Sequence, residues 1–383
     1  MLKNFKQTQV NFVNIDQTFY KRLVYSFYDA YNEKFDYNSK MLTSTNNDQN
    51  QLTPISTTDR WHNYQQINGE QTHDDILALL KNNQKQISEL RGHPVIAYLT
   101  AINTDSSSSQ INLNDKDIKE FASLVADIDE NICEIDVILH SYGGYIESAH
   151  VIIELLRDRF KKVNFLIPFA AHSAASMMCM AADDIIMTPE SSLSPFDVQV
   201  LSPDDNKIYL PAQIMKECAK EAKKANNLFH ILTPKNLYKN WDGKIIRQTK
   251  LFCDISIKQS KSYPMYWLMK YMFKSSESNN LFFINFLFMP LWKRFTSNGR
   301  KANNIVKLFV NTGIKLSHNT PIMYNDLKNT GLNVSKADSQ LLSLMRETYQ
   351  LADVLFQSST IKKIYTSSNK SFFSFITPEN KRY

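Results

Sequence analysis

Two loops of the chain hold the residue types that acyl-transfer chemistry requires. The first, HSYGGYIES at 140–148, places Gly143 and Gly144 between an apolar run and a helical segment. Adjacent glycines let the backbone turn sharply and present bare N–H groups. The second loop, AAHSAAS at 170–176, places Ser173 directly before an alanine-rich helical segment. A serine hydroxyl there is either a helix cap that accepts a backbone N–H, or a nucleophile beside amide donors that stabilise an oxyanion.

The elements around these loops favour the nucleophile. Apolar runs alternate with helical segments, with runs at 94–102, 135–140, 163–169 and 184–188 and helices near 115–130, 145–160 and 174–182. This alternation predicts an α/β fold, and runs without a polar side predict a parallel sheet covered on both faces. Loops that follow consecutive parallel strands lie at the same edge of a sheet. We therefore expect Ser173 to face an oxyanion hole made by the N–H of Ala174 and a glycine amide.

A serine nucleophile also needs a general base. His172 is adjacent to Ser173, and neighbouring side chains diverge. His140 ends a neighbouring strand and is an auxiliary candidate, although a capping or core histidine is commoner at such a position. Lysines are the other candidates, because burial lowers the pKa of a lysine towards neutrality. The helical segment 210–227 supplies four of them, and the pattern does not select one: Lys216, Lys220, Lys223 and Lys224.

The composition argues against several other classes of protein. The chain has 383 residues, of which 43% are hydrophobic and 21% charged, as in globular proteins. A net charge of +6 with scattered lysines argues against nucleic-acid binding. There is no Cys/His cluster, GxxxxGK[ST] or GxGxxG motif, so we expect no metal and no cofactor. Four cysteines without paired spacing, and a start without an apolar signal segment, predict a reduced, cytoplasmic protein.

The chain is predicted to divide into five parts, which are an amphipathic helical segment at 1–40, a polar linker at 41–60, a core at 61–250, an aromatic-rich insertion at 251–300 and a helical C-terminal part of the same fold at 301–383. The run LFFINFLFMPLW at 281–292 is too short to span a bilayer. We expect it to form a buried helix or subunit contact, with peripheral insertion at a membrane surface as the alternative.

The segment from IDVILHSYGG (135–144) to SLSPFDVQV (192–200) resembles the serine dehydrogenase proteinase family, a branch of the Clp/crotonase-type serine peptidases related to signal peptide peptidases. A second block, LSHNTPIMYNDLKNTGLNV at 316–334, is similar to the late segment of that family. The resemblance spans roughly residues 90–350. It implies stacked ββα units with a largely parallel sheet, helical additions at both ends, assembly into trimers or larger homo-oligomers, and hydrolysis of peptides or unfolded chains.

Carried over to this chain, the resemblance gives Ser173 the nucleophile position, because Ala181 and Ala182 follow it at the spacing seen in signal peptide peptidases. Ser176 becomes a helix residue in place of the family's usual threonine. The resemblance assigns the oxyanion hole to the amides of Gly143 or Gly144 and of Ala174.

The resemblance also narrows the choice of base. Related membrane peptidases use a Ser-Lys dyad, and Clp-type enzymes use Ser-His-Asp. No histidine lies between Ser173 and His230, so a lysine is favoured. Lys216 lies at about the right distance along the chain, and Lys220 is auxiliary.

Two departures from the family pattern keep alternatives open. Tyr142 stands where the family has proline, and Ser194 replaces a glycine in an LGPxDPQ-like segment. Our hypothesis is a serine endopeptidase. The main alternative is a catalytically inactive oligomeric scaffold that binds a protein or a membrane. A crotonase-like enzyme acting on an acyl thioester, with Glu147 as its carboxylate, ranks last.

Overall fold

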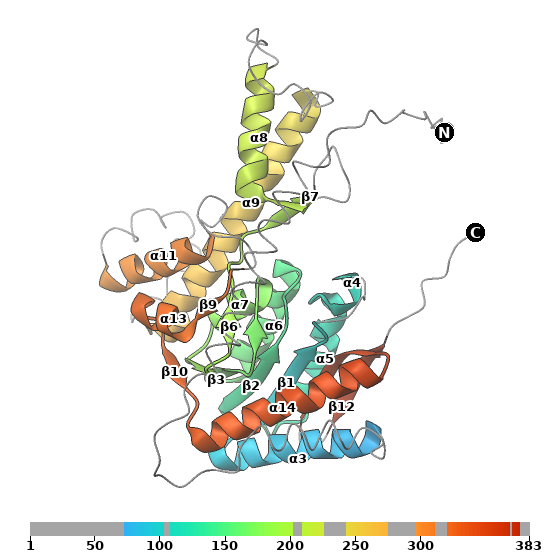
Figure 1. Cartoon of the computed structure of the whole chain (residues 1–383). Coiled ribbons are helices and arrows are strands. Elements are labelled where there is room, and N and C mark those ends of the chain that lie inside the picture. Colours follow the sequence, from blue (N-terminus) through green and yellow to red (C-terminus); the bar gives the residue numbers. More distant parts are fainter. Residues whose placement is uncertain are drawn as a thin grey trace, which may run out of the picture. The chain divides into compact units, whose positions relative to one another are not determined.

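The structure is a computed structural model that describes residues 73–102, 108–201, 209–225, 243–274, 296–310, 320–367 and 370–375 (Figure 1). The helices are α3 (His73–Arg91), α4 (Ser108–Ile111), α5 (Asp115–Ala126), α6 (Ile146–Arg159), α7 (Ala174–Cys179), α8 (Ala212–Ala225), α9 (Gly243–Trp267), the π-helix η1 (Leu268–Met272), α11 (Ser297–Val310), α13 (Tyr324–Thr330) and α14 (Ser339–Ser358). The strands are β1 (Val95–Thr100), β2 (Glu134–His140), β3 (Lys162–Ile167), β4 (Ala170–Ala171), β5 (Asp184–Met187), β6 (Ser192–Leu193), β7 (Gln199–Leu201), β8 (Tyr209–Pro211), β9 (Ile322–Met323), β10 (Val334–Lys336), β11 (Ile361–Thr366) and β12 (Ser371–Phe375). The predicted parts 1–40 and 41–60 and the apolar run 281–292 lie outside the described residues.

The described chain is built on a seven-stranded sheet with the order β10-β5-β3-β2-β1-β11-β12. The five strands from β10 to β1 are parallel, and β11 and β12 are antiparallel additions at one edge. The predicted α/β fold with a largely parallel sheet is therefore confirmed. The two antiparallel strands lie in the C-terminal part that the sequence predicts to be helical.

Both faces of this sheet are buried, as the uniformly apolar runs predict. Along β1, Ile96 and Tyr98 enter one core cluster, and Ala97 and Leu99 enter another. Helices α3 and α14 lie side by side against the second cluster (Figure 1). The first cluster is covered by α5, α6, α7, α9 and α11. The alternation follows from strand geometry, because successive side chains point to opposite faces of a sheet.

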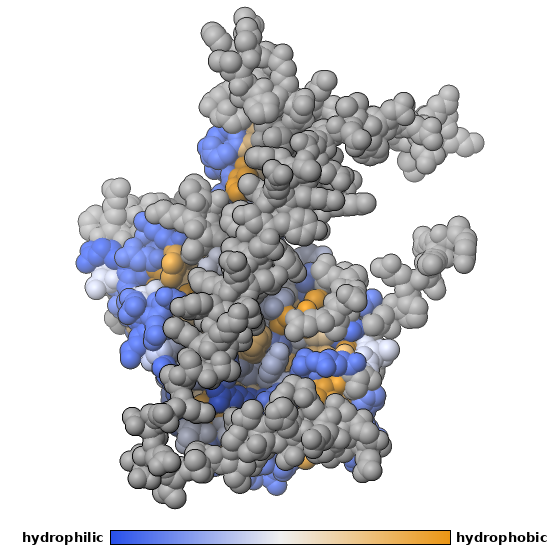
Figure 2. Space-filling model, in the orientation of Figure 1, coloured by the Kyte–Doolittle hydropathy of each residue, from blue (hydrophilic) through white to orange (hydrophobic). Residues whose placement is uncertain are grey.

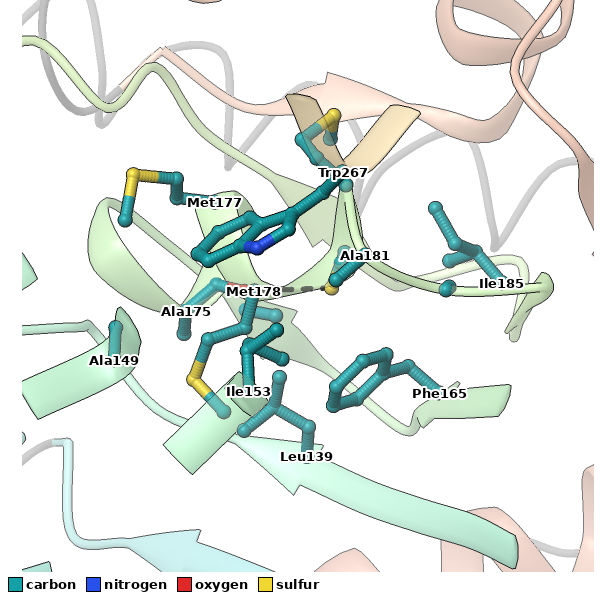
Figure 3. Close-up of a cluster of buried hydrophobic side chains, with 14 of the residues drawn as sticks. Leu139, Ala149, Ile153, Phe165, Ala175, Met177, Met178, Ala181, Ile185 and Trp267 are labelled. Carbon is teal, nitrogen blue, oxygen red and sulfur yellow. Dashed lines mark hydrogen bonds between the residues drawn. The ribbon is translucent and has the colours of Figure 1, made fainter. Parts of the chain in front are cut away.

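The short helix α7 is buried in the first cluster (Figure 3). Every one of its residues is buried, and its small alanines allow close packing. The indole of Trp267, at the end of α9, packs in the same cluster and donates a hydrogen bond to Glu154 Oε1 of α6 at 3.3 Å. The start of α7, where Ser173 lies, is therefore fixed by core packing on several sides.

Helices α8 and α9 pack along each other and enclose a third, smaller apolar cluster that includes Met215 and Cys253. None of the helices in the described ranges is long and apolar enough to cross a membrane.

Candidate active site

Ser173 lies at a turn between the β3–β4 segment and α7, with φ 51° and ψ −122°. Positive φ is unfavourable for a residue with a side chain, and holding such a conformation costs about 1–3 kcal/mol. The hydroxyl of Ser173 makes no capping hydrogen bond to α7. The helix-cap alternative is therefore wrong for this hydroxyl, which has no hydrogen-bond partner among the described residues.

Three hydrogen bonds hold the backbone of this turn. The Ser173 N–H donates to Ser194 Oγ at 2.9 Å, and the Ser194 N–H donates to Ser176 Oγ at 2.8 Å. Ser176 Oγ in turn donates to the carbonyl of Ala171 at 2.5 Å. Ser194 stands out in the sequence only as a departure from the family pattern. In the structure it anchors the proposed nucleophile's backbone.

The structure brings the glycine loop against the Ser173 turn. Ser141 forms a parallel bridge with Ala171, and its carbonyl accepts the His172 N–H at 2.9 Å. Gly143, at φ 87°, is so close that a Cβ built on it would lie 2.6 Å from Ala174 N and 2.9 Å from Ser173 Cβ. Only glycine fits there, because both the backbone angle and the contact exclude a side chain.

The amides at this contact differ in their partners. The Gly143 N–H donates to Ser141 Oγ at 3.1 Å. Gly144 is held with its Cα against Leu113, where a Cβ would lie 2.3 Å from the Leu113 oxygen. In the described part of the chain, no group accepts a hydrogen bond from the N–H of Gly144 or of Ala174. Of the two candidate glycines, Gly144 therefore has the uncommitted amide.

The two histidines near the site are occupied by other contacts. The ring of His172 stacks on that of Tyr142 with centroids 5.0 Å apart, and its Nε2 lies 2.9 Å from Ser192 Oγ. His140 is fully buried, and its Nδ1 accepts the Ala170 N–H at 3.3 Å. Burial, and secondarily the charge of His172, lowers the pKa of His140 to about 3, so this imidazole is neutral.

The candidate lysines on α8 are engaged in ion pairs. Lys216 Nζ is bound to the carboxylate of Asp254 on α9. Lys220 Nζ lies 2.5 Å from Glu217 Oε1 on its own helix. No hydrogen bond joins either lysine to Ser173 among the residues that the structure describes.

A pocket of about 400 Å³ lies at the opposite, amino-terminal edge of the strands, away from Ser173. Its lining includes Glu134, Lys162 and Asp184, each at the first residue of a parallel strand. In open α/β sheets, active sites lie at the carboxyl ends of the strands, which is the edge of the Ser173 turn and not the edge of this pocket. Within the described ranges, no group of three or more His, Cys, Asp or Glu side chains is placed to hold a metal ion.

Comparison with known protein families gives a match for the segment that contains the site. Residues 115–236 match the family of ClpP-like SDH-type serine proteinases. The resemblance stated from the sequence is thereby confirmed for this segment, which contains Ser173 and both glycines. The match supports a serine peptidase.

Individual relatives match only in part. The uncharacterized protein MJ1495 of Methanocaldococcus jannaschii is 35% identical over 66 residues, which cover 17% of this chain and 23% of that protein. The ClpP protease catalytic domain from Plasmodium falciparum is 15% identical, with 24% of this chain and 63% of that chain covered and a TM-score of 0.19. A mutant of the 1510-N membrane-bound stomatin-specific protease is also 15% identical, with 33% and 71% covered and a TM-score of 0.24.

Proposed function

We propose that this protein is a serine endopeptidase that cleaves peptides or unfolded chains through a Ser173 acyl-enzyme. Ser173 Oγ attacks the peptide carbonyl carbon, and the carbonyl oxygen takes the negative charge. The N–H groups of Gly144 and Ala174 then donate to this oxyanion. Expulsion of the amine leaves an ester on Ser173, which water hydrolyses.

The observation that carries this proposal is the uncommitted hydroxyl of Ser173 beside two uncommitted amides. A serine held at positive φ, with its hydroxyl unused as a cap, lies against a glycine loop that excludes any side chain. Donors fixed before the reaction need no reorganisation when charge develops. Each is worth on the order of 3 kcal/mol of barrier.

We propose Lys216 as the general base, which takes the proton of Ser173 and passes it to the leaving amine. Its ammonium is bound to Asp254, and a lysine in that state has no lone pair with which to accept a proton. This route therefore requires that Lys216 leave Asp254 when substrate binds or the protein assembles. Lys216→Met should then abolish hydrolysis, and Asp254→Asn, which releases the amine, should raise it. Full activity of Lys216→Met would rule out this base.

We also propose that the protein is a cytoplasmic homo-oligomer. Helix α9 exposes Leu251, Phe252 and Ile255, whose exposed fractions are 63%, 56% and 49%. Figure 2 shows a small apolar strip in the region of helices α8 and α9. Exposed apolar side chains that gather on one helix favour self-association. Sedimentation of the full chain beside a Phe252→Glu variant tests this, and a monomer in both cases contradicts it.

The decisive experiment compares hydrolysis by the full chain with that by Ser173→Ala. Casein and a mixed library of fluorogenic peptides serve as substrates between pH 6 and 10, after both proteins are shown to have the same oligomeric state. Activity that disappears only in the variant supports the proposal. Equal activity of both proteins contradicts the assignment of Ser173.

One observation favours a second candidate function, an inactive scaffold for a protein or membrane partner. No lysine or histidine of the described chain forms a hydrogen bond with the Ser173 hydroxyl. In that case neither protein hydrolyses any substrate, and a fluorophosphonate probe does not label Ser173.

A further inference from the structure

A buried hydrogen-bonded chain starts at the glycine loop and runs into the protein. The Gly143 N–H donates to Ser141 Oγ at 3.1 Å. Ser141 is completely buried, and its hydroxyl lies near enough to the phenol of Tyr98 on β1 to lower the pKa of that phenol, against the larger effect of burial. The Tyr98 hydroxyl reaches Asp117 Oδ2 of α5 at 3.3 Å. The chain thus links the backbone beside Ser173 to a carboxylate in the core.

Every donor in this chain points the same way. The Tyr98 hydroxyl donates its proton to Asp117 Oδ2. Burial, the largest effect, raises the pKa of Tyr98 well above its usual value and keeps that proton in place. The oxygen of Tyr98 is then free to accept from Ser141, whose own oxygen accepts from Gly143. Hydrogen bonds aligned in this way polarise one another, so the carboxylate strengthens the hold on the Gly143 amide.

The carboxylate itself is anchored by the C-terminal strand β11. Lys363 Nζ lies 2.8 and 2.9 Å from the two oxygens of Asp117, and Tyr365 of the same strand also donates to it. The side chains of Lys363 and Asp117 are 2% and 0% exposed. A buried ion pair adds little net stability, because desolvation offsets the attraction. What this pair does provide is an acceptor at a fixed place.

The same pair holds the other side of the glycine loop. Lys363 Nζ donates to the carbonyl of Asn112 at 2.8 Å, which fixes the segment next to Leu113. Leu113 N–H donates to the Gly143 carbonyl at 2.8 Å, and the Leu113 carbonyl accepts the Tyr145 N–H at 2.9 Å. Both the amide and the carbonyl of Gly143 are therefore restrained from α5 and β11, and the Gly144 N–H is the amide left for a ligand.

We propose that Ser141 and Tyr98 are positioning residues for the oxyanion hole, and that β11 sets its geometry through Lys363 and Asp117. This inference rests on the proposed function. Oxyanion donors act only when they lie at hydrogen-bond distance from the developing charge, so small shifts of the loop matter. Since the donors serve the transition state, their displacement lowers kcat and leaves KM nearly unchanged.

The test compares Tyr98→Phe and Ser141→Ala with Tyr365→Phe as the matched control. All three variants remove one buried hydroxyl, and Tyr365→Phe also takes a donor from Asp117 but leaves the chain to Gly143 intact. The ring of Tyr98 keeps its packing on Phe121, with centroids 5.5 Å apart, when it becomes phenylalanine. Thermal denaturation first establishes that the variants fold.

The first readout is hydrogen–deuterium exchange of the Gly143 amide in the full chain, which does not depend on activity. We expect the Gly143 amide to exchange about tenfold faster in Tyr98→Phe and Ser141→Ala, because a tenfold change corresponds to the loss of one net hydrogen bond. Its exchange rate should be unchanged in Tyr365→Phe. Equal exchange in all three variants overturns the proposal, whether or not the protein is a peptidase.

The second readout is kinetic and uses a fluorogenic peptide and a peptide boronic acid, whose tetrahedral adduct occupies the oxyanion hole. In Tyr98→Phe and Ser141→Ala, kcat and the affinity for the boronate should fall by about tenfold, while KM stays unchanged. This loss is smaller than the hundredfold or greater loss of kcat that follows when an oxyanion donor is removed altogether. A change in KM alone overturns the positioning role. If the wild-type protein neither cleaves peptides nor binds the boronate, the proposed function fails, and the exchange readout still decides whether the chain holds the loop.

Discussion

Replacing Gly143 by alanine should break the contact between the glycine loop and the Ser173 turn. Two costs combine in this variant. A side chain at φ 87° costs about 1–2 kcal/mol. The new Cβ would also lie 2.6 Å from both Ala174 N and the His172 carbonyl oxygen, which are backbone atoms fixed by the core. Such overpacking costs a further ~1–3 kcal/mol.

Gly92 provides a matched control, because it has φ 75° and nothing within 4 Å of a built Cβ. Gly92→Ala therefore carries the conformational cost without the contact. In urea denaturation, Gly143→Ala should lose about 1–3 kcal/mol more than Gly92→Ala. Its Ser173 should also react more slowly with a fluorophosphonate, while Gly92→Ala reacts as the wild type does. Equal losses of stability in the two variants would refute the close approach of the two loops.

Three further predictions concern the supports of the site. Ser194→Ala leaves the partly buried Ser173 N–H without its acceptor, so it should lower stability by about 1–3 kcal/mol and slow labelling of Ser173. As a control, Ser191→Ala removes a buried hydroxyl that donates to the Thr188 carbonyl, and Ser173 in this variant should be labelled at the wild-type rate. His140, with its pKa lowered to about 3 by burial, is neutral in the fold but takes up a proton in the unfolded chain below pH 6.5. Stability should therefore fall as the pH drops from 6.5 towards 3, by up to ~1.4 kcal/mol per unit, and His140→Gln should show a flatter profile in pH-dependent denaturation. Arg157 donates both to Asp183, at 2.6 Å, and to the Ala181 carbonyl, at 3.0 Å, behind α7. Lysine cannot reproduce both bonds, so Arg157→Lys should lower the melting temperature, and an unchanged value would contradict this support.

The central strands could be predicted because buried strands appear in the sequence as runs of apolar residues. The run predicted at 94–102 forms β1 at Val95–Thr100, and the other three predicted runs are also strands. Each is predominantly apolar because both faces of the sheet are covered. Strand β11 was missed because its sequence, IKKIYT, places two lysines among its apolar residues. Lys363 is buried only because Asp117 lies beside it, and that partner is 246 residues away in sequence.

The nucleophile could be proposed from sequence, but its base could not. A turn from strand to helix with a serine is a local pattern, and the glycine loop is another. A base is defined by its distance from the hydroxyl, which depends on how α8 packs. The family resemblance favours Lys216, and the structure pairs Lys216 with Asp254, an acid on a helix that the sequence gives no reason to connect with it.

The two departures from the family pattern bear on whether the site is intact. Tyr142, in place of proline, stacks on His172 with an angle of 1° between the rings. Ser194, in place of glycine, supplies the oxygen that accepts the Ser173 N–H. A backbone at positive φ relaxes unless its surroundings hold it. At Ser173, one of the contacts that hold the backbone is made by Ser194, the residue that replaces the family's glycine. A glycine at 194 could not make that bond. The departures therefore hold the strained turn instead of releasing it, as the proposed peptidase requires.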